Sequence, residues 1–219
     1  MIVTTPAVIA AYPRSGSTWL RFVLCNLLYP SQEHDFASVN RCIPPIDDPA
    51  GLLNGIDHPL FYKTHAKVTS SNIVYVYRHV GDVLESEWWY KRKMWDEKRS
   101  FEDYLKATEF GKEWREHVEH YFPAISNVSY EQIGMVATYE RLTFDDPLTT
   151  RRALEKAEID KMRKLEERGF GIYPSGNTQI DFCRKGESGN WKQWAPALKQ
   201  KLLDANKVQL KLLGYAEIQ

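Results

Sequence analysis

Residues 7–28 read AVIAAYPRSGSTWLRFVLCNLL, and the character of the sequence changes in the middle of this stretch. A short apolar run over residues 7–12 is followed by a Pro-Arg-Ser-Gly turn and then by a helical pattern over residues 18–28. Short apolar runs are typical of buried strands, and proline and glycine mark turns. Strand, loop and helix in this order predict the opening unit of a parallel α/β sheet.

The rest of the chain repeats this alternation. Further apolar runs predict strands at residues 60–63, 73–77 and 135–139. Helical patterns predict helices at residues 81–93, 101–122, 147–157, 159–168 and 196–213. The proline-rich residues 29–59 are expected to be irregular, with a short helix at 50–53, and the glycine-rich residues 169–189 to form a loop. We therefore expect an α/β fold, a parallel sheet flanked by helices on both faces, in a single domain over residues 1–219.

Composition excludes several classes of protein. Lysine plus arginine and aspartate plus glutamate each number 29, so the net charge of zero argues against a nucleic-acid-coating protein. No apolar run approaches the roughly 20 residues of a membrane span, and the first residues lack the basic start of a signal peptide. Cys25, Cys42 and Cys183 show neither disulfide nor zinc-ligand spacing, which favours reduced thiols, a cytoplasmic location and no metal.

The loop after the first predicted strand has the features of an anion site. A helix that begins near Gly16 directs backbone N–H groups and its positive dipole end toward one point. Arg14, Ser15, Ser17 and Thr18 add a cation and three hydroxyl donors there. The loop lacks the GxxxxGK[ST] pattern of nucleotide triphosphatases. A plain helix N-cap by a serine is the alternative interpretation.

Chemically active side chains also follow two other predicted strands. Lys63 and His65 lie at the end of one strand, and Arg78 lies at the end of the next, with Ser86 eight residues later. Ligands of parallel sheets bind beyond the carboxyl ends of the strands, so these groups are expected to converge. Taken alone, His65 fits a structural histidine and Arg78 fits a surface pair with Asp82. A further basic segment, RKGESGNWK, occupies residues 184–192.

Four of these segments together resemble the cytosolic-type sulfotransferases. Residues 12–19, YPRSGSTW, are similar to the phosphosulfate-binding loop YPKSGTTW of that family. Residues 63–65 (KTH), 76–86 (VYRHVGDVLES) and 184–192 resemble its K-T-H, YVxRxxxDVxxS and RKGxxGDWK segments in the expected order. The resemblance spans residues 7–194. It implies a P-loop NTPase-like sulfotransferase fold and the transfer of a sulfuryl group from 3′-phosphoadenosine 5′-phosphosulfate (PAPS) to a hydroxyl of a small molecule, with PAP as product.

The resemblance also implies roles for single residues. His65 would be the general base, and Lys63 and Arg14 would offset charge at the transferring group, with no metal. Trp19 would lie near the adenine. The phosphosulfate group would be held by Arg14, Ser15, Gly16, Ser17 and Thr18. The 3′-phosphate would be held by Arg78, Ser86, Arg184, Lys185 and Gly186.

The chain departs from the family pattern at two of these positions. Arg14 stands where the family has lysine, and Asn190 where it has aspartate. Aromatic residues in two segments fit either an acceptor pocket or ordinary packing: Phe36, Trp88, Trp89, Tyr90 and Trp95. The alternatives are a small-molecule kinase of P-loop type and a non-catalytic PAPS- or PAP-binding protein. A homodimer is compatible with the family but has no signature here.

Overall fold

Within the part of the chain that the computed structural model describes, four parallel strands form one sheet. The described residues are 6–29, 31–32, 34–46, 59–69, 73–122, 135–138 and 189–215. The strands are β1 Ala7–Ala11, β2 Phe61–Thr64, β3 Ile73–Tyr77 and β4 Met135–Thr138. Each overlaps a predicted strand, with ends that differ by no more than one residue from the prediction. The predicted helices at 50–53, 147–157 and 159–168 lie outside the described residues.

The strand order is β2-β1-β3-β4. In the register of the sheet, Ile9 lies between Lys63 of β2 and Val74 of β3. The chain leaves β1 toward one neighbour and later crosses to the other, so β1 and β3 flank the point where the direction of winding reverses. Doubly wound sheets bind ligands in the crevice beyond the strands at such a point.

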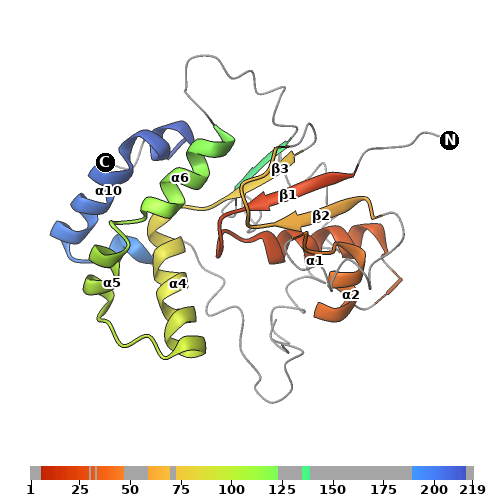
Figure 1. The fold of residues 1–219 in the computed structure, drawn as a ribbon, viewed down its shortest axis with the longest axis horizontal. Coiled ribbons are helices and arrows are strands. Elements are labelled where there is room, and N and C mark those ends of the chain that lie inside the picture. The colour runs from red at the N-terminus through yellow and green to blue at the C-terminus, as the bar shows by residue number, and fades with distance from the viewer. Residues whose placement is uncertain are drawn as a thin grey trace.

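Helices cover both faces of the sheet. Helices α1 Ser17–Leu28 and α2 Phe36–Cys42 lie on one side, as Figure 1 shows. The other side carries α4 Val80–Trp95, α5 Phe101–Ala107, α6 Lys112–Tyr121 and α10 Pro196–Leu212. A short 3₁₀ helix, η2 Asn190–Gln193, packs against α4. The predicted fold class is confirmed.

The two faces divide the apolar core, because side chains alternate along each strand. Ile9, Ala11 and Val76 pack with α1 and α2. Ala10 and Tyr75 pack with α4, α5, α6 and α10. All residues of β1 and β3 are therefore buried on both faces of the sheet, which explains why the two strands are continuous apolar runs in the sequence.

Two helical predictions differ from the structure. Residues 36–42 were expected to be irregular but form α2, which starts with a capping box between Asp35 and Ser38. The predicted helical stretch 101–122 is broken, because Glu109, Phe110 and Gly111 all have positive φ. A Cβ at Gly111 would lie 2.9 Å from Val80 Cγ2, so the break lets this backbone approach α4 closely.

Candidate functional site

The loop between β1 and α1 is held in an unusual backbone conformation. Arg14 has a φ of 68° and Gly16 a φ of 103°, so two of the three residues before α1 are left-handed. Glycine adopts this conformation without cost, whereas a non-glycine residue in it is uncommon and often functional. Ser15 between them is fully buried. The loop therefore turns tightly and directs its backbone toward the start of α1.

This loop is chemically suited to an anion. Among the described residues, no side chain caps the N-terminus of α1, and its first turn contains no acidic residue. The buried Oγ atom of Ser15 likewise has no hydrogen-bond partner among them. Buried polar groups are nearly always paired, so a donor left unsatisfied beside a helix N-terminus fits an oxyanion ligand. A phosphate or phosphosulfate group would satisfy both.

Arg14 joins this loop to α4. Its Nε donates a hydrogen bond to Ser86 Oγ at 3.1 Å, and its guanidinium lies 4.9 Å from the centre of the Tyr90 ring. A guanidinium stacked on an aromatic ring keeps a fixed direction. The structure thus brings together Arg14 and Ser86, which come from two different sequence motifs.

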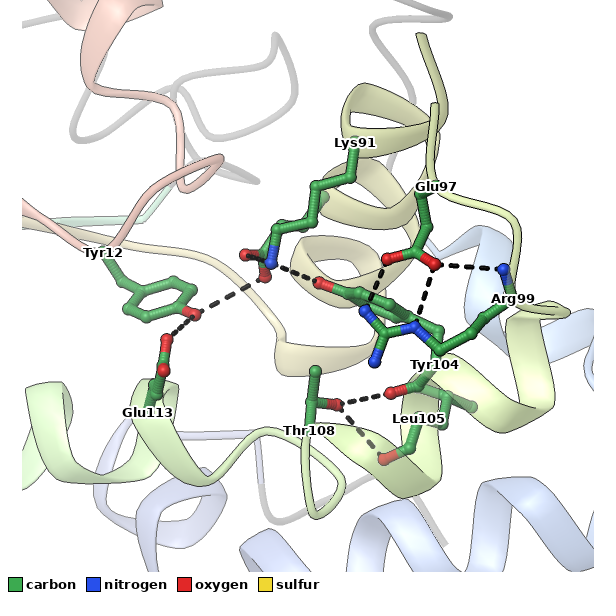
Figure 2. Close-up of polar contacts among 9 residues, drawn as sticks. Tyr12, Lys91, Glu97, Arg99, Tyr104, Leu105, Thr108 and Glu113 are labelled. Atoms are coloured by element: carbon green, nitrogen blue, oxygen red, sulfur yellow. Dashed lines mark hydrogen bonds and ion pairs between the residues drawn. The ribbon is translucent and has the colours of Figure 1, made fainter. Parts of the chain in front are cut away.

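Tyr12 anchors the start of the loop to the helices on the other side. Its hydroxyl lies 3.5 Å from both Glu87 Oε2 of α4 and Glu113 Oε2 of α6, and Figure 2 shows it directed toward Glu113. Glu87 is also ion-paired at 2.7 Å with Lys91, which bonds the hydroxyl of Tyr104 at 3.1 Å. Burial and these carboxylates raise the pKa of Tyr12 well above its usual value, so the hydroxyl stays a donor.

His65 lies just beyond β2 and is oriented by the end of β1. Its Nδ1 lies 2.7 Å from the carbonyl oxygen of Ala11. A carbonyl oxygen only accepts, so Nδ1 carries the hydrogen and Nε2 is the basic nitrogen of the neutral ring. That tautomer is the one a general base at this position requires.

A second histidine supports the backbone of the first. His117 Nε2 donates to the carbonyl oxygen of His65 at 3.2 Å, and the hydroxyl of Tyr75 donates to His117 Nδ1 at 2.9 Å. Burial lowers the pKa of His117 to about 4, which keeps the ring neutral and both bonds intact near neutral pH. The sequence held no signal for this contact, because a lone histidine in a helix is ambiguous.

Lys63 lies two residues before His65, in register with the buried Ile9. Paired residues of neighbouring strands share a face, so Lys63 belongs to the α1 side of the sheet. Its backbone also pairs outside the sheet: Lys63 N–H donates to Pro44 O at 3.0 Å, and Ile46 N–H donates to Lys63 O at 2.7 Å. The segment after α2 therefore braces β2, which contains Lys63 and ends one residue before His65.

Arg78 is buried directly after β3, at the same edge of the sheet. Four residues later Asp82, in the first turn of α4, accepts hydrogen bonds from the backbone N–H groups of Gly189 (2.8 Å) and Asn190 (3.1 Å). Burial raises the pKa of Asp82, and the Arg78 charge and these two donors oppose that effect. Asp82 is therefore no surface partner: it ties the C-terminal segment to the helix that follows Arg78.

Aromatic stacking strengthens this attachment. The rings of His79 and Trp191 stack at 4.0 Å with an interplanar angle of 7°. Burial, with Lys192 and Arg78 nearby, lowers the pKa of His79 to about 3, and its Nδ1 accepts the N–H of Gly81 at 3.1 Å. Trp191 lies so close to α4 that a Cβ at Gly81 would approach its Cβ and Cγ to 2.6 Å. Arg184, Lys185 and Gly186 lie outside the described residues.

The aromatic candidates for an acceptor pocket are spread apart. Phe36 packs edge-on against Phe22 of α1, with ring centres 5.3 Å apart. Trp88 packs on Phe101 at 5.2 Å and bonds a backbone carbonyl, whereas Trp95 is 67% exposed. Tyr90 contacts Arg14 of the loop between β1 and α1. Trp19 is buried in the core on the α1 face, as a packing residue would be.

Comparison with known proteins identifies the family to which this chain belongs. The sequence profile described as "Sulfotransferase domain" matches residues 4–212. The chain belongs to the sulfotransferase family. It is accordingly a transferase of the sulfotransferase class, as its four ordered motifs predicted.

Relatives and solved structures agree with this membership. Cytosolic sulfotransferase 7 of Arabidopsis thaliana is 26% identical over 91% of this sulfotransferase and 77% of its own length. Human sulfotransferase 2A1 is 24% identical over 84% of this chain and 76% of its own. The mouse sulfotransferase SULT7A1, solved with PAP, superposes with a TM-score of 0.64 at 14% identity, covering 96% of this chain and 86% of that one.

A second structural neighbour is retinol dehydratase in complex with retinol and PAP. Its TM-score is 0.66 at 17% identity, and the match covers 94% of this chain and 81% of that one. At these identities the likeness establishes the fold. Over the described residues of this sulfotransferase, no helix is long and apolar enough to cross a membrane.

Proposed function

We propose that this sulfotransferase transfers the sulfuryl group of PAPS to a hydroxyl of a small molecule. The observation that carries the proposal is that, among the described residues, no side chain caps the N-terminus of α1 and none pairs with the buried Ser15 Oγ beside it. Such a site accepts an oxyanion and lacks the lysine-containing loop that a triphosphate requires. The solved neighbours named above contain PAP, which supports PAPS as donor.

In this proposal the donor lies across the crevice between β1 and β3. The phosphosulfate group would contact Arg14, Ser15 and the backbone at Gly16, with Ser17 and Thr18 in the first turn of α1. The 3′-phosphate would contact Arg78 and Ser86. Asp82 binds the N–H of Gly189, which is only three residues after Gly186. It would therefore hold the C-terminal segment close enough for Arg184, Lys185 and Gly186 to complete that subsite. Trp19 would reach the adenine only at its edge, because it is 6% exposed.

We assign the proton transfer to His65. As the acceptor oxygen bonds to sulfur, the bond from sulfur to the phosphate oxygen breaks, and the acceptor proton moves to His65 Nε2. The hydrogen bond from Nδ1 to Ala11 stabilises the resulting imidazolium and its orientation. Arg14 and Lys63 would offset the negative charge on the transferring group and the leaving phosphate. These side chains supply the cations, so we expect transfer without magnesium.

The acceptor class is inferred from relatives. Sulfotransferases similar to this chain are named for a flavonol and for 3-hydroxysteroids, all small molecules with a hydroxyl. A zero net charge does not favour a nucleic-acid partner. We propose a single domain acting in the cytoplasm, as the names of the Arabidopsis relatives indicate for them. The molar mass in solution, measured by light scattering, would show whether the chain forms a homodimer.

Calorimetry with PAP tests the donor site first. PAP titrated in the presence of a chelator should bind with a micromolar or lower Kd, and ATP should not bind. Ser15→Ala should weaken PAP binding by about ten-fold, the cost of one charge-assisted hydrogen bond. Ser38→Ala, in the exposed cap of α2, is the matched control and should bind PAP normally.

Turnover then separates the alternatives. A radiolabelled sulfuryl group should pass from PAPS to the hydroxyl of phenols or hydroxysteroids in the presence of the chelator. Tight PAP binding without turnover on any hydroxyl would support the non-catalytic binding protein. ATP binding with magnesium and no PAP binding would replace the proposal with the small-molecule kinase.

A further inference from the structure

Three potential metal ligands meet on the α1 face of the sheet, away from the donor site. One ligand atom each from Cys25 in α1, His34 before α2 and Cys42 at the end of α2 lie within 4.8 Å of one another. Figure 1 shows α1 and α2 side by side on that face. Cys25 follows Ser17 by eight residues, about 12 Å along the helix axis. The cluster is therefore separate from the anion site.

The hydrogen bonding of the His34 ring leaves one ring nitrogen available to a metal ion. Its Nε2 lies 3.2 Å from the carbonyl oxygen of Tyr29, so Nε2 carries the hydrogen. Nδ1 then holds the lone pair, and among the described residues this buried atom has no hydrogen-bond partner. His34 is 4% exposed, so water does not readily satisfy that lone pair. Metal-bound histidines are held in this way, with the second ring nitrogen donating to a carbonyl oxygen.

The two cysteines supply a compatible pair of thiols. Both pack with the apolar core of this face, where Cys25 is fully buried and Cys42 partly exposed. Tetrahedral bonds of about 2.3 Å to sulfur and 2.0–2.1 Å to nitrogen set ligand atoms about 3.5–3.8 Å apart, so separations within 4.8 Å need a contraction of about 1.3 Å at most. Two thiolates and Zn²⁺ leave no net charge to bury.

Arg21 fixes the far side of the cluster. Its guanidinium donates to the carbonyl oxygens of Val39 (3.3 Å) and Ile43 (2.7 Å), which holds α2 against α1. The geometry of the cluster is thus set by contacts that do not depend on a metal.

A redox pair fits these observations less well. Cys25 is fully buried, so an external thiol or disulfide has little access to it for exchange. A Cys25–Cys42 disulfide would also leave the buried His34 Nδ1 without a partner among the described residues. A metal ion bound by both sulfur atoms would take that lone pair as well.

We propose that Cys25, His34 and Cys42 bind one thiophilic divalent cation, Zn²⁺, in a structural site that joins α1 to α2. The fourth position of a tetrahedral ion is open to water or another side chain. Binding replaces two S–H bonds with two S–Zn bonds and releases two protons. The ion would fasten the segment that braces Lys63, and so would stabilise the fold without taking part in transfer.

Cobalt and zinc titrations of the reduced, chelator-treated full-length protein test the site. One Co²⁺ per chain should bind with the intense visible bands of a tetrahedral site and a thiolate-to-cobalt band in the near ultraviolet. Zn²⁺ should displace it, release about two protons per ion near neutral pH and raise the Tm. His34→Gln should weaken Zn²⁺ binding by more than about ten-fold.

Matched variants decide the assignment. Cys42→Ser, at the partly exposed ligand, should remove the thiolate band or halve it, whereas Cys183→Ser should leave the spectrum and stoichiometry unchanged. Circular dichroism checks that each variant is folded. Absence of Co²⁺ binding by the wild-type protein, or loss of binding in Cys183→Ser alone, would overturn the proposal. So would a Cys25–Cys42 disulfide on isolation, with no metal bound after its reduction.

Discussion

The imidazole of His65 is held by the carbonyl oxygen of Ala11, 2.7 Å from Nδ1 and 54 residues earlier in the chain. Ala11 ends the central strand β1, and β2, which ends one residue before His65, pairs with β1 in parallel. The carboxyl ends of neighbouring parallel strands lie at one edge, so this bond is a direct consequence of the topology. The sheet thereby selects the tautomer in which Nε2 is basic.

His65→Gln should abolish most turnover and leave donor binding intact. Removing a general base costs about 10²–10⁴-fold in rate, and no contact to PAP is assigned to this ring. Sulfate transfer and PAP calorimetry on the same preparation measure the two effects. A parallel loss of PAP affinity would mean that His65 organises the donor site instead.

Arg14→Lys should lower kcat/KM by about ten-fold, the cost of about one hydrogen bond to a charged group. Lysine keeps the charge but loses the fork that contacts Ser86 and stacks on Tyr90. A double-mutant cycle with Ser86→Ala should show coupling of about 1 kcal/mol. Tyr90→Phe keeps the ring face and serves as the control with near-normal rate; additive effects of Arg14 and Ser86 would contradict the contact.

Asp82→Ala should weaken PAP binding by about ten-fold, since it removes two hydrogen bonds that position the C-terminal segment. Asp82→Asn keeps one acceptor oxygen and should lose less. Asp204→Asn, exposed on α10, is the control for loss of a carboxylate. Lower thermal stability of Asp82→Ala with unchanged PAP affinity would restrict Asp82 to a structural role.

The sequence was sufficient for the sheet and for the local motifs. The runs at β1 and β3 are apolar throughout because both faces are covered, so they show no period, and their short length indicated strands. α2 was missed because it is seven residues long and its signal is a capping box in a proline-rich segment. The break before α6 was missed because it depends on the approach of Gly111 to Val80.

The contacts that assemble the site were beyond sequence reasoning for a different reason. Arg14 with Ser86, Asp82 with Gly189 and His117 with His65 join residues 52–107 positions apart. The parallel-sheet topology predicts that groups at the strand ends converge, but neither periodicity nor motif spacing predicts which side chains bond to one another. The cysteines illustrate the same limit: Cys25 and Cys42 lack any metal-ligand spacing, yet helix packing brings them to His34.

Gly81→Ala should destabilise the protein by about 1–3 kcal/mol, because its Cβ would overlap Trp191 at 2.6 Å. The same substitution in a Trp191→Gly background should cost much less, since glycine removes both the Cβ and the Cγ that the new Cβ would approach. Chemical denaturation of the four proteins gives the coupling energy. Equal costs in both backgrounds would show that Gly81 is needed for its backbone rather than for the approach of Trp191.

The stability of this sulfotransferase should fall in mild acid partly through His117. Burial lowers the pKa of His117 from 6.5 to about 4, so the native ring stays neutral in a range where the unfolded ring binds a proton. The unfolded state therefore gains protons first, and the free energy of unfolding decreases as pH falls from about 6.5 to about 4. The contribution of His117 lowers the free energy of unfolding by about 2 kcal/mol at pH 5.

His117→Gln should remove that share of the pH dependence. The variant loses hydrogen bonds to Tyr75 and to the His65 carbonyl, so its stability at pH 7.5 should be lower by about 1–3 kcal/mol. Its further loss between pH 7.5 and pH 5, measured by urea denaturation, should be about 2 kcal/mol smaller than that of the wild type. His79 contributes equally to both proteins and cancels. If the further loss for His117→Gln instead equals that of the wild type, the native His117 ring binds a proton as readily as the unfolded ring, and the prediction is wrong.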